Sequence, residues 1–128
     1  IVTTPQDIAL LDARKGLKMF EKVEVPVLGI VENMSIHICS KCGHEEHIFG
    51  QGGGSSMASQ YHVDLLGALP LDIRIREETD GGKPTVVAEP EARISQIYRE
   101  IARKTAAKLS LQAKDYAAKF PNIVIQNN

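Results

Sequence analysis

Two cysteines separated by two residues are the part of this sequence best suited to chemistry. They are Cys39 and Cys42, in the segment Cys39-Ser40-Lys41-Cys42-Gly43. The short gap brings both sulfur atoms to one side of a tight turn, and Gly43 permits the left-handed backbone that lets nearby N–H groups point at the thiolates. Because thiolates bind zinc and iron, the pair is predicted to supply half of the ligands of a metal or iron–sulfur centre.

The spacing alone leaves open how the other half of the ligands is supplied. Tetrahedral zinc and [4Fe–4S] clusters usually take four ligands, and a twofold-related copy of the chain could add its own pair at a dimer interface. Zinc bound within one chain, with His44 or His47 as a further ligand, is an alternative, as is a pair of solvated thiols without a role. A thioredoxin-like redox pair fits less well, because Gly-His-Glu-Glu-His and a glycine-rich stretch follow Cys42 instead of a helix.

The composition is that of an ordinary soluble globular protein with one domain. Of the 128 residues, 43% are hydrophobic and 24% charged, and the net charge of −1 argues against a nucleic-acid binder. The apolar runs are far shorter than the roughly 20 residues that span a bilayer, so no membrane partner is expected. Two cysteines cannot build a multi-bridge disulfide framework, which favours a reducing, cytoplasmic setting.

The elements that must position the cysteines alternate between apolar strands and amphipathic helices. Strands are predicted at 1–3, at 26–31 (PVLGIV) and at 64–69 (DLLGAL). Thr4 and Pro5 predict a helix start, and the core-facing residues of that helix are predicted to be Ala9, Ala13, Leu17 and Phe20. Further helices are predicted at 55–61 and at 91–111. The second of these is predicted to be amphipathic, with its apolar face at Ile94, Ile97, Tyr98, Ile101, Thr105 and Leu109. This order predicts an α/β fold with a partial doubly wound, mostly parallel sheet whose other strands precede Ile1.

Between the second strand and the next helix, the hydrophobic periodicity disappears. The stretch at about 34–54 holds both cysteines and is predicted to be a long functional loop without regular structure. It ends in Gly52-Gly53-Gly54, which lacks the following GK[ST] of a Walker A motif and is predicted to be a flexible connection.

Two segments lie where parallel α/β folds place ligand-contacting groups, at the carboxyl ends of strands. They are Asn33, just after the PVLGIV strand, and Pro70-Leu71-Asp72, just after the DLLGAL strand. The Asn33 amide offers a donor and an acceptor that suit the edge of a base. Taken alone, each segment is more often a turn element than a ligand contact, and the second one is also predicted to start a short helical turn.

Several motifs in order along the chain resemble the Mrp/ApbC iron–sulfur cluster carrier proteins, of the MinD/ParA branch of P-loop NTPases. The resemblance covers Ile1 to about Leu109. It rests on Thr4-Pro5-Gln6, Leu28-Gly29-Ile30-Val31-Glu32-Asn33-Met34-Ser35, Cys39-x-x-Cys42-Gly43, Phe49-Gly50-x-Gly52-Gly53, Leu66-Gly67-x-x-Pro70-Leu71-Asp72 and Gly82-Lys83-Pro84. The chain departs from the family at Ile36-His37-Ile38, where members often carry an aromatic residue.

The resemblance implies a homodimeric ATPase that binds a [4Fe–4S] cluster between its subunits and passes it to apo-proteins. It implies that Cys39 and Cys42 bridge the cluster, which zinc could replace, and that Asn33 and Pro70, Leu71 and Asp72 line the adenine pocket of bound ATP. The family's deviant Walker A loop would lie before Ile1. Residues 1–111 are therefore expected to be the carboxyl-terminal part of the NTPase domain, inactive alone as an ATPase, and the tail 112–128 is assigned no role.

Overall fold

A computed structural model describes residues 1–39 and 41–112 of the chain, so the predicted tail lies outside the described residues apart from Gln112. Its centre is a parallel sheet in the order β1-β2-β5. The strands are β1 (Val2–Thr3), β2 (Ile30–Glu32) and β5 (Leu65–Ala68). Val2 pairs with Val31 and Ile30 pairs with Leu65. The α/β fold with a parallel sheet is therefore confirmed.

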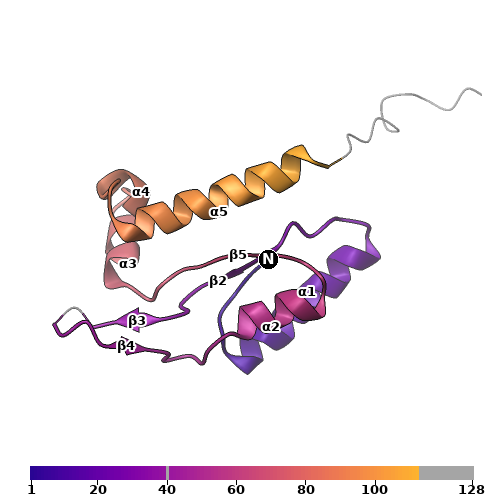
Figure 1. Ribbon diagram of the computed structural model, residues 1–128, viewed down its shortest axis with the longest axis horizontal. Helices are drawn as coiled ribbons and strands as arrows, with labels where there is room; N and C mark the ends of the chain where they lie inside the picture. Colours follow the sequence, from indigo (N-terminus) through magenta and orange to yellow (C-terminus); the bar gives the residue numbers. More distant parts are fainter. Residues whose placement is uncertain (40, 113–128) are drawn as a thin grey trace, which may run out of the picture.

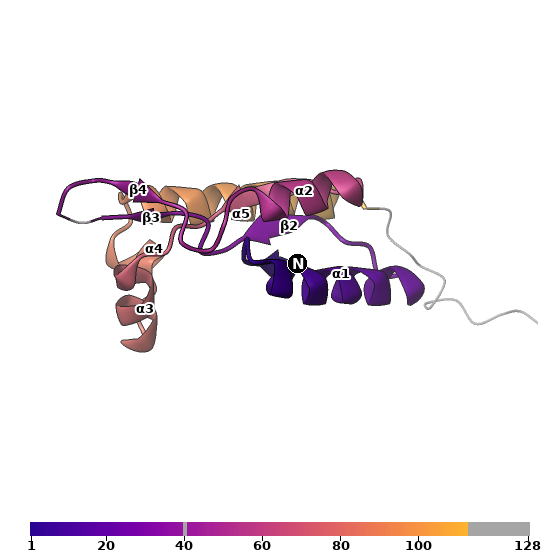
Figure 2. The ribbon, with the colours of Figure 1, turned by 90° about the horizontal axis from the view of Figure 1, so that it is seen from below.

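The helices cover both faces of this sheet (Figure 1). The helices α1 and α2 lie on one face, and the long helix α5 runs along the other. The bounds are α1 (Asp7–Lys22), α2 (Gly53–Gln60), α3 (Ile73–Asp80), α4 (Thr85–Ala88) and α5 (Arg93–Ser110). At one end of the sheet, Figures 1 and 2 show α3, α4 and a two-stranded hairpin, β3 (His37–Ile38) with β4 (Glu45–Glu46), extending beyond the three-layered body.

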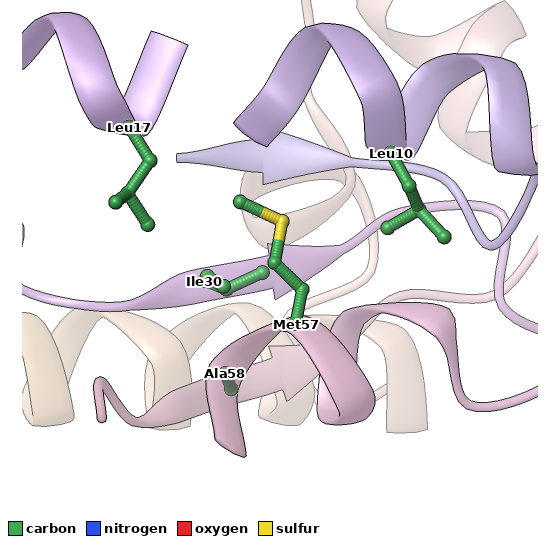
Figure 3. Packing of buried hydrophobic residues seen from close by; sticks show 5 residues of the cluster. All are labelled: Leu10, Leu17, Ile30, Met57 and Ala58. Carbon is green, nitrogen blue, oxygen red and sulfur yellow. The ribbon is translucent and has the colours of Figure 1, made fainter. Parts of the chain in front are cut away.

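A buried apolar cluster fixes α1 and α2 to the sheet (Figure 3). In it, Met57 of α2 points toward Ile30 of β2 and the leucines of α1. The buried members are Leu10, Leu17, Ile30, Met57 and Ala58. Predicted core residue Leu17 is among them, and Ala13 packs against the cluster from a partly buried position. Leu10 is also buried in this cluster, although it is not among the residues of this helix predicted to face the core.

A second cluster fixes α5 to the opposite face. Val31, Leu66 and Leu69 are buried there, with Ile97, Tyr98 and Ile101 of α5 packed against them. These three α5 residues follow the predicted amphipathic pattern. Leu109, predicted for the same face, is 58% exposed instead, because α5 extends past the end of the sheet at its last turn.

The strand at 26–31 is shorter than predicted, because regular pairing begins only at Ile30. Ahead of it, Pro26 has no N–H to donate to a neighbouring strand. Gly29 marks a close approach of two chain segments, since a Cβ there would lie 2.6 Å from the backbone oxygen of Asp64. The N–H of Ile30 then donates to that same oxygen at 2.8 Å, which starts the pairing with β5.

The first helix begins later than the sequence predicts. Its N-cap is Gln6, and no side chain caps the helix. Thr4 is therefore not the cap, and its hydroxyl instead lies 3.4 Å from the Gln6 side-chain oxygen. Pro5 is buried and lies under Gly53, whose missing Cβ would meet the Pro5 backbone oxygen at 2.9 Å. Pro5 therefore packs against α2 and precedes α1, instead of being the first residue of α1.

Within the described part of the chain, no helix combines the length and apolar character needed to cross a bilayer.

Candidate functional site

Both cysteines lie at the tip of the β3–β4 hairpin. The strands pair in antiparallel register, His37 with Glu46 and Ile38 with Glu45. Past β3, the N–H of Cys39 donates to the backbone oxygen of His44 at 2.9 Å, and the N–H of Gly43 donates to that of Cys39 at 2.8 Å. The prediction of a loop without regular structure is therefore wrong for this stretch. Two-residue strands leave no periodicity to detect, and a few backbone hydrogen bonds define the hairpin.

The turn offers the two thiols to solvent and favours ionisation of one of them. Cys39 is partly exposed and Cys42 exposed, and neither is in a disulfide. Hydrogen bonds from the backbone N–H groups of Lys41 and Cys42, and from the Cys42 thiol, lower the pKa of the Cys39 thiol below its ordinary value. Gly43 has the predicted left-handed backbone, with φ of +71°. Since the thiolate is the form that binds metals, this turn is prepared for a thiophilic ligand.

The described residues of a single chain do not assemble a larger ligand set around the pair. Among residues 1–39 and 41–112, no group of three or more His, Cys, Asp and Glu side chains could hold a metal ion. His47 is turned to the base of the hairpin, where its Nδ1–H donates to the backbone oxygen of Ser35 at 3.0 Å. The described residues therefore do not gather the Cys39, Cys42 and histidine set of the single-chain zinc alternative.

A cavity of about 670 Å³ lies beside the hairpin, with Cys39 in its wall. Most of its surface is apolar, and the residues that line it include five isoleucines, namely Ile36, Ile38, Ile73, Ile94 and Ile97. The segment Pro70-Leu71-Asp72 forms another wall, so one cavity joins the predicted nucleotide-binding segment to Cys39 and the strand that leads to it.

Hydrogen bonds join residues 69–71, after β5, to residues 35–37, at the start of the hairpin. The N–H of Leu71 donates to the oxygen of Ile36 at 2.8 Å, and the N–H of Ser35 donates to that of Leu69 at 2.9 Å. The Nδ1–H of His37 donates to the Leu71 oxygen at 3.2 Å. The cysteine hairpin thus continues the line of the sheet past the end of β5.

Asn33 lies at the carboxyl end of β2, as predicted, but not in the wall of this cavity. Its N–H donates to the backbone oxygen of Thr3 at 2.7 Å, which joins the ends of β1 and β2. Its side-chain oxygen accepts the N–H of Met34 at 3.0 Å, and Met34 has a left-handed backbone with φ of 55°. The structure therefore gives Asn33 a turn-forming role and leaves its part in nucleotide binding a prediction.

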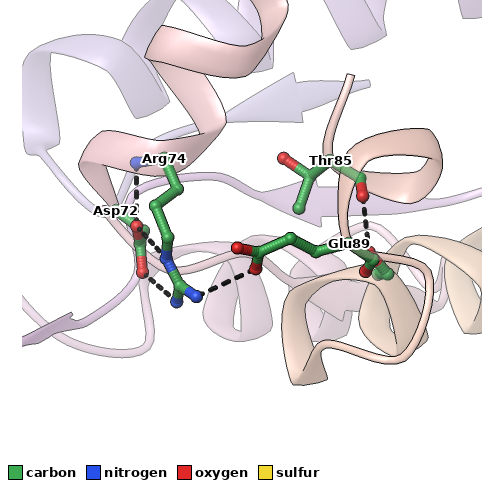
Figure 4. Close-up of polar contacts among 5 residues, drawn as sticks. Asp72, Arg74, Thr85 and Glu89 are labelled. Atoms are coloured by element: carbon green, nitrogen blue, oxygen red, sulfur yellow. Dashed lines mark hydrogen bonds and ion pairs between the residues drawn. The ribbon is translucent and has the colours of Figure 1, made fainter. Parts of the chain in front are cut away.

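Asp72 is the N-cap of α3 and the centre of an ionic network (Figure 4). Its Oδ1 accepts the N–H of Arg74 at 2.9 Å, and its Oδ2 pairs with the Arg74 guanidinium at 2.8 Å. The same guanidinium reaches Glu89 at 3.1 Å, which links α3 to the end of α4. The predicted helical turn after Pro70 is confirmed.

The contacts of Asp72 predict that part of the free energy of unfolding is lost in acid. Hydrogen bonding to Arg74 lowers the pKa of the Asp72 carboxyl below its ordinary value of about 3.9. A lowered folded-state pKa stabilises the protein above the ordinary value, and this contribution is lost as pH falls through the lower folded-state pKa. The wild type should therefore be more stable than Asp72→Asn at pH 7, by up to about 1 kcal/mol for a partly exposed ion pair, because Asn keeps the helix cap but loses the charge that pairs with Arg74. The difference should shrink below about pH 4. Urea unfolding of both proteins from pH 7 to 3 measures it, and a constant difference would contradict the assignment.

The glycine run is a helix start, not the flexible connection predicted for it. Gly52 is the N-cap of α2 with a left-handed φ of 73°, and Gly53 and Gly54 form the first turn. The N–H of Gly54 donates to Oε2 of Glu32 at 2.5 Å. The sequence predicts no role for Glu32, which directly follows the apolar strand predicted at 26–31, although a carboxylate after such a run is a signal for a polar contact.

Comparisons with known proteins agree with this architecture. The family model described as ParA, NUBPL iron-transfer P-loop NTPase, matches residues 1–106. A protein of Salmonella typhimurium named iron–sulfur cluster carrier protein is 62% identical over 114 residues, which cover 89% of this chain and 31% of that protein. The mouse iron–sulfur cluster transfer protein NUBPL is 49% identical over 109 residues, covering 85% of this chain and 34% of the relative. The chain thus spans about a third of the length of these relatives.

Solved structures point to the same fold. The septum site-determining protein MinD of Pyrococcus horikoshii, complexed with Mg-ADP, matches 89% of this chain and 44% of its own, with a TM-score of 0.65 and 25% identity. A nucleotide-binding protein of Archaeoglobus fulgidus, in complex with ADP, matches 70% of this chain and 35% of its own, with a TM-score of 0.56 and 34% identity. With a family model that matches most of its length, the chain belongs to the ParA family of NUBPL-type iron-transfer P-loop NTPases.

Proposed function

We propose that this chain is the cluster-binding portion of an iron–sulfur cluster carrier. In the proposal, Cys39 and Cys42 of two copies hold one [4Fe–4S] cluster, which the carrier passes to apo-proteins. The observation that carries it is the position of the cysteine pair, exposed at a hairpin tip with the pKa of Cys39 lowered. The names of the relatives, iron–sulfur cluster carrier and transfer proteins, support the same role.

This placement suits delivery of a cluster. A resident cluster is usually held by several ligands in a protected site, whereas an exposed pair gives each chain only half of the coordination. Separating the two copies then dismantles the site and releases the cargo. Exposed thiolates also oxidise readily, so the proposal requires a reducing compartment such as the cytoplasm.

We further propose that the full-length protein couples this cargo to ATP. In the proposal, Asn33 and the Pro70–Asp72 segment lie against the adenine, and the phosphate-binding loop comes from the rest of the protein. Within the described residues β1 is an edge strand, and Val2 is 66% exposed, so its outer backbone groups are open to pairing with further strands of the sheet. Because Leu71 is hydrogen-bonded to Ile36 and His37, at the start of the hairpin that leads to Cys39, a base bound at Pro70–Asp72 would act on the hairpin directly.

The alternative is a structural zinc knuckle that holds a dimer together without transfer, since four thiolates suit zinc as well as a cluster. Anaerobic purification of the full-length protein distinguishes the two. The carrier should be brown, contain iron and sulfide in equal amounts, and activate an apo-enzyme that needs a [4Fe–4S] cluster. A colourless protein that retains zinc after reconstitution with iron and sulfide, and does not activate the apo-enzyme, would contradict the carrier.

A further inference from the structure

We propose that Glu32 is a positioning residue that fixes the base of the cysteine hairpin. The inference rests on the proposed function only for its consequence, the lifetime of the bound cluster. Glu32 is the last residue of β2 and is 4% exposed, although it carries an ionisable carboxyl group. It lies at the point where the chain leaves the sheet to form the hairpin and, some twenty residues later, returns to α2.

The two oxygens of this carboxylate accept hydrogen bonds from the two ends of the segment 33–54, which leaves the sheet after β2 and returns at α2. Oε1 accepts the hydroxyl of Ser35 at 2.7 Å, on the outgoing segment. Oε2 accepts the N–H of Gly54 at 2.5 Å, in the first turn of α2 where the chain returns. One buried side chain therefore holds together two segments that are far apart along the sequence.

The contact extends from the sheet into the hairpin through Ser35. The N–H of Ser35 donates to the Leu69 oxygen at 2.9 Å, and its own backbone oxygen accepts Nδ1–H of His47 at 3.0 Å. His47 directly follows β4. Glu32, Ser35 and His47 thus connect the end of β2 with both strands that carry the cysteine turn.

The chemistry of the site explains why an acidic residue stands here. Its partner at Gly54 is a backbone N–H, which can only donate, and the carboxylate is the side chain that can accept on both oxygens. The first turn of a helix also favours a negative charge. Gly54 leaves room for this contact, because a Cβ there would lie 3.0 Å from both Cβ and Oε2 of Glu32.

Hydrogen exchange in the full-length, cluster-free protein tests the positioning role. In Glu32→Ala, the backbone amides of Cys39 and Gly43 should exchange about tenfold faster, as expected for losing a hydrogen bond to a charged acceptor. Glu32→Gln should restore most of the protection, since its oxygen can accept from Gly54 and its NH₂ can donate to the Ser35 hydroxyl. Glu46→Ala, which removes an exposed glutamate of the hairpin, should leave the rates unchanged.

Ser35→Ala is the second variant, for the case that Glu32→Ala does not fold. It cuts the link to the outgoing segment but leaves the Gly54 contact, and it should also raise the exchange rates of the hairpin amides. Wild-type rates in the folded Ser35→Ala and Glu32→Ala variants would overturn the positioning role. So would a loss of protection in Glu32→Gln as large as in Glu32→Ala.

Cluster lifetime is measured separately, as loss of iron to a chelator from reconstituted protein. Glu32→Ala should shorten the lifetime several-fold relative to wild type, and Glu32→Gln should not. A wild-type protein that binds no cluster would overturn the proposed function, whereas the exchange rates of the cluster-free protein would still test the role of Glu32. The two failures are therefore distinguishable.

Discussion

Replacing either Cys39 or Cys42 by serine in the full-length protein is expected to abolish cluster binding. Serine keeps the size of the side chain, but its hydroxyl stays protonated at neutral pH and does not replace a thiolate ligand. In a site shared by two copies, one substitution removes two of four ligands at once. Iron and sulfide should therefore fall at least about tenfold, to the background of unreconstituted protein.

The fold should survive these substitutions, because neither cysteine belongs to the two buried clusters that hold the helices on the sheet. His44→Ala is the matched control within the same turn, since the contact that His44 makes to Cys39 comes from its backbone oxygen, which accepts the Cys39 N–H and survives the substitution. It should bind a full complement of iron. Normal iron content in Cys39→Ser would mean that the ligands lie elsewhere, and loss of iron in His44→Ala would revive a site that includes histidine.

Leu17→Ala is expected to have the largest effect on stability. The Leu17 side chain is 1% exposed and fills the cluster between α1, β2 and α2 (Figure 3). Removing three buried carbons costs their transfer free energy and leaves a cavity, together about 2–5 kcal/mol of the free energy of unfolding. Because α2 is the next element after the cysteine hairpin, weakening this apolar cluster also loosens the helix to which the chain returns from the hairpin.

Denaturant unfolding of the full-length protein measures this effect as a shift of the midpoint to lower urea concentration. Leu109→Ala in α5 is the matched control, since it is the same substitution at a side chain that is 58% exposed. It should change the free energy of unfolding by no more than about 0.5 kcal/mol. Equal effects of the two substitutions would contradict the assignment of Leu17 to the core.

Much of the fold could be predicted because each of the longer elements has an apolar pattern within its own sequence that matches the period of a strand or a helix. The apolar segments ending at Val31 and Leu69 predict buried parallel strands, and Ile97, Tyr98 and Ile101 predict the face of α5 that packs on the sheet. The strand ends were less predictable. Gly29 reads as one more residue of an apolar strand, yet it marks the close approach to Asp64 that precedes the pairing.

The tight turn at the cysteine pair was predictable from the two-residue gap and Gly43, but the contacts that support the turn were not. Each strand of the hairpin has two residues, and the contacts that fix it come from Leu71, Leu69 and Glu32, which are distant in sequence or carry no pattern. The glycine run was misread for the same reason. Its backbone is set by tertiary packing against Glu32 and Pro5, and local propensity does not report such packing.

Native mass spectrometry of the reconstituted full-length protein tests directly whether two copies share one cluster, because it counts chains and cluster atoms in one particle. We expect two chains with one [4Fe–4S] cluster, and separation into single chains without iron when the cluster is removed or Cys42 is replaced by serine. A single chain that carries a complete cluster, or a dimer that carries only zinc and refuses iron, would contradict this expectation.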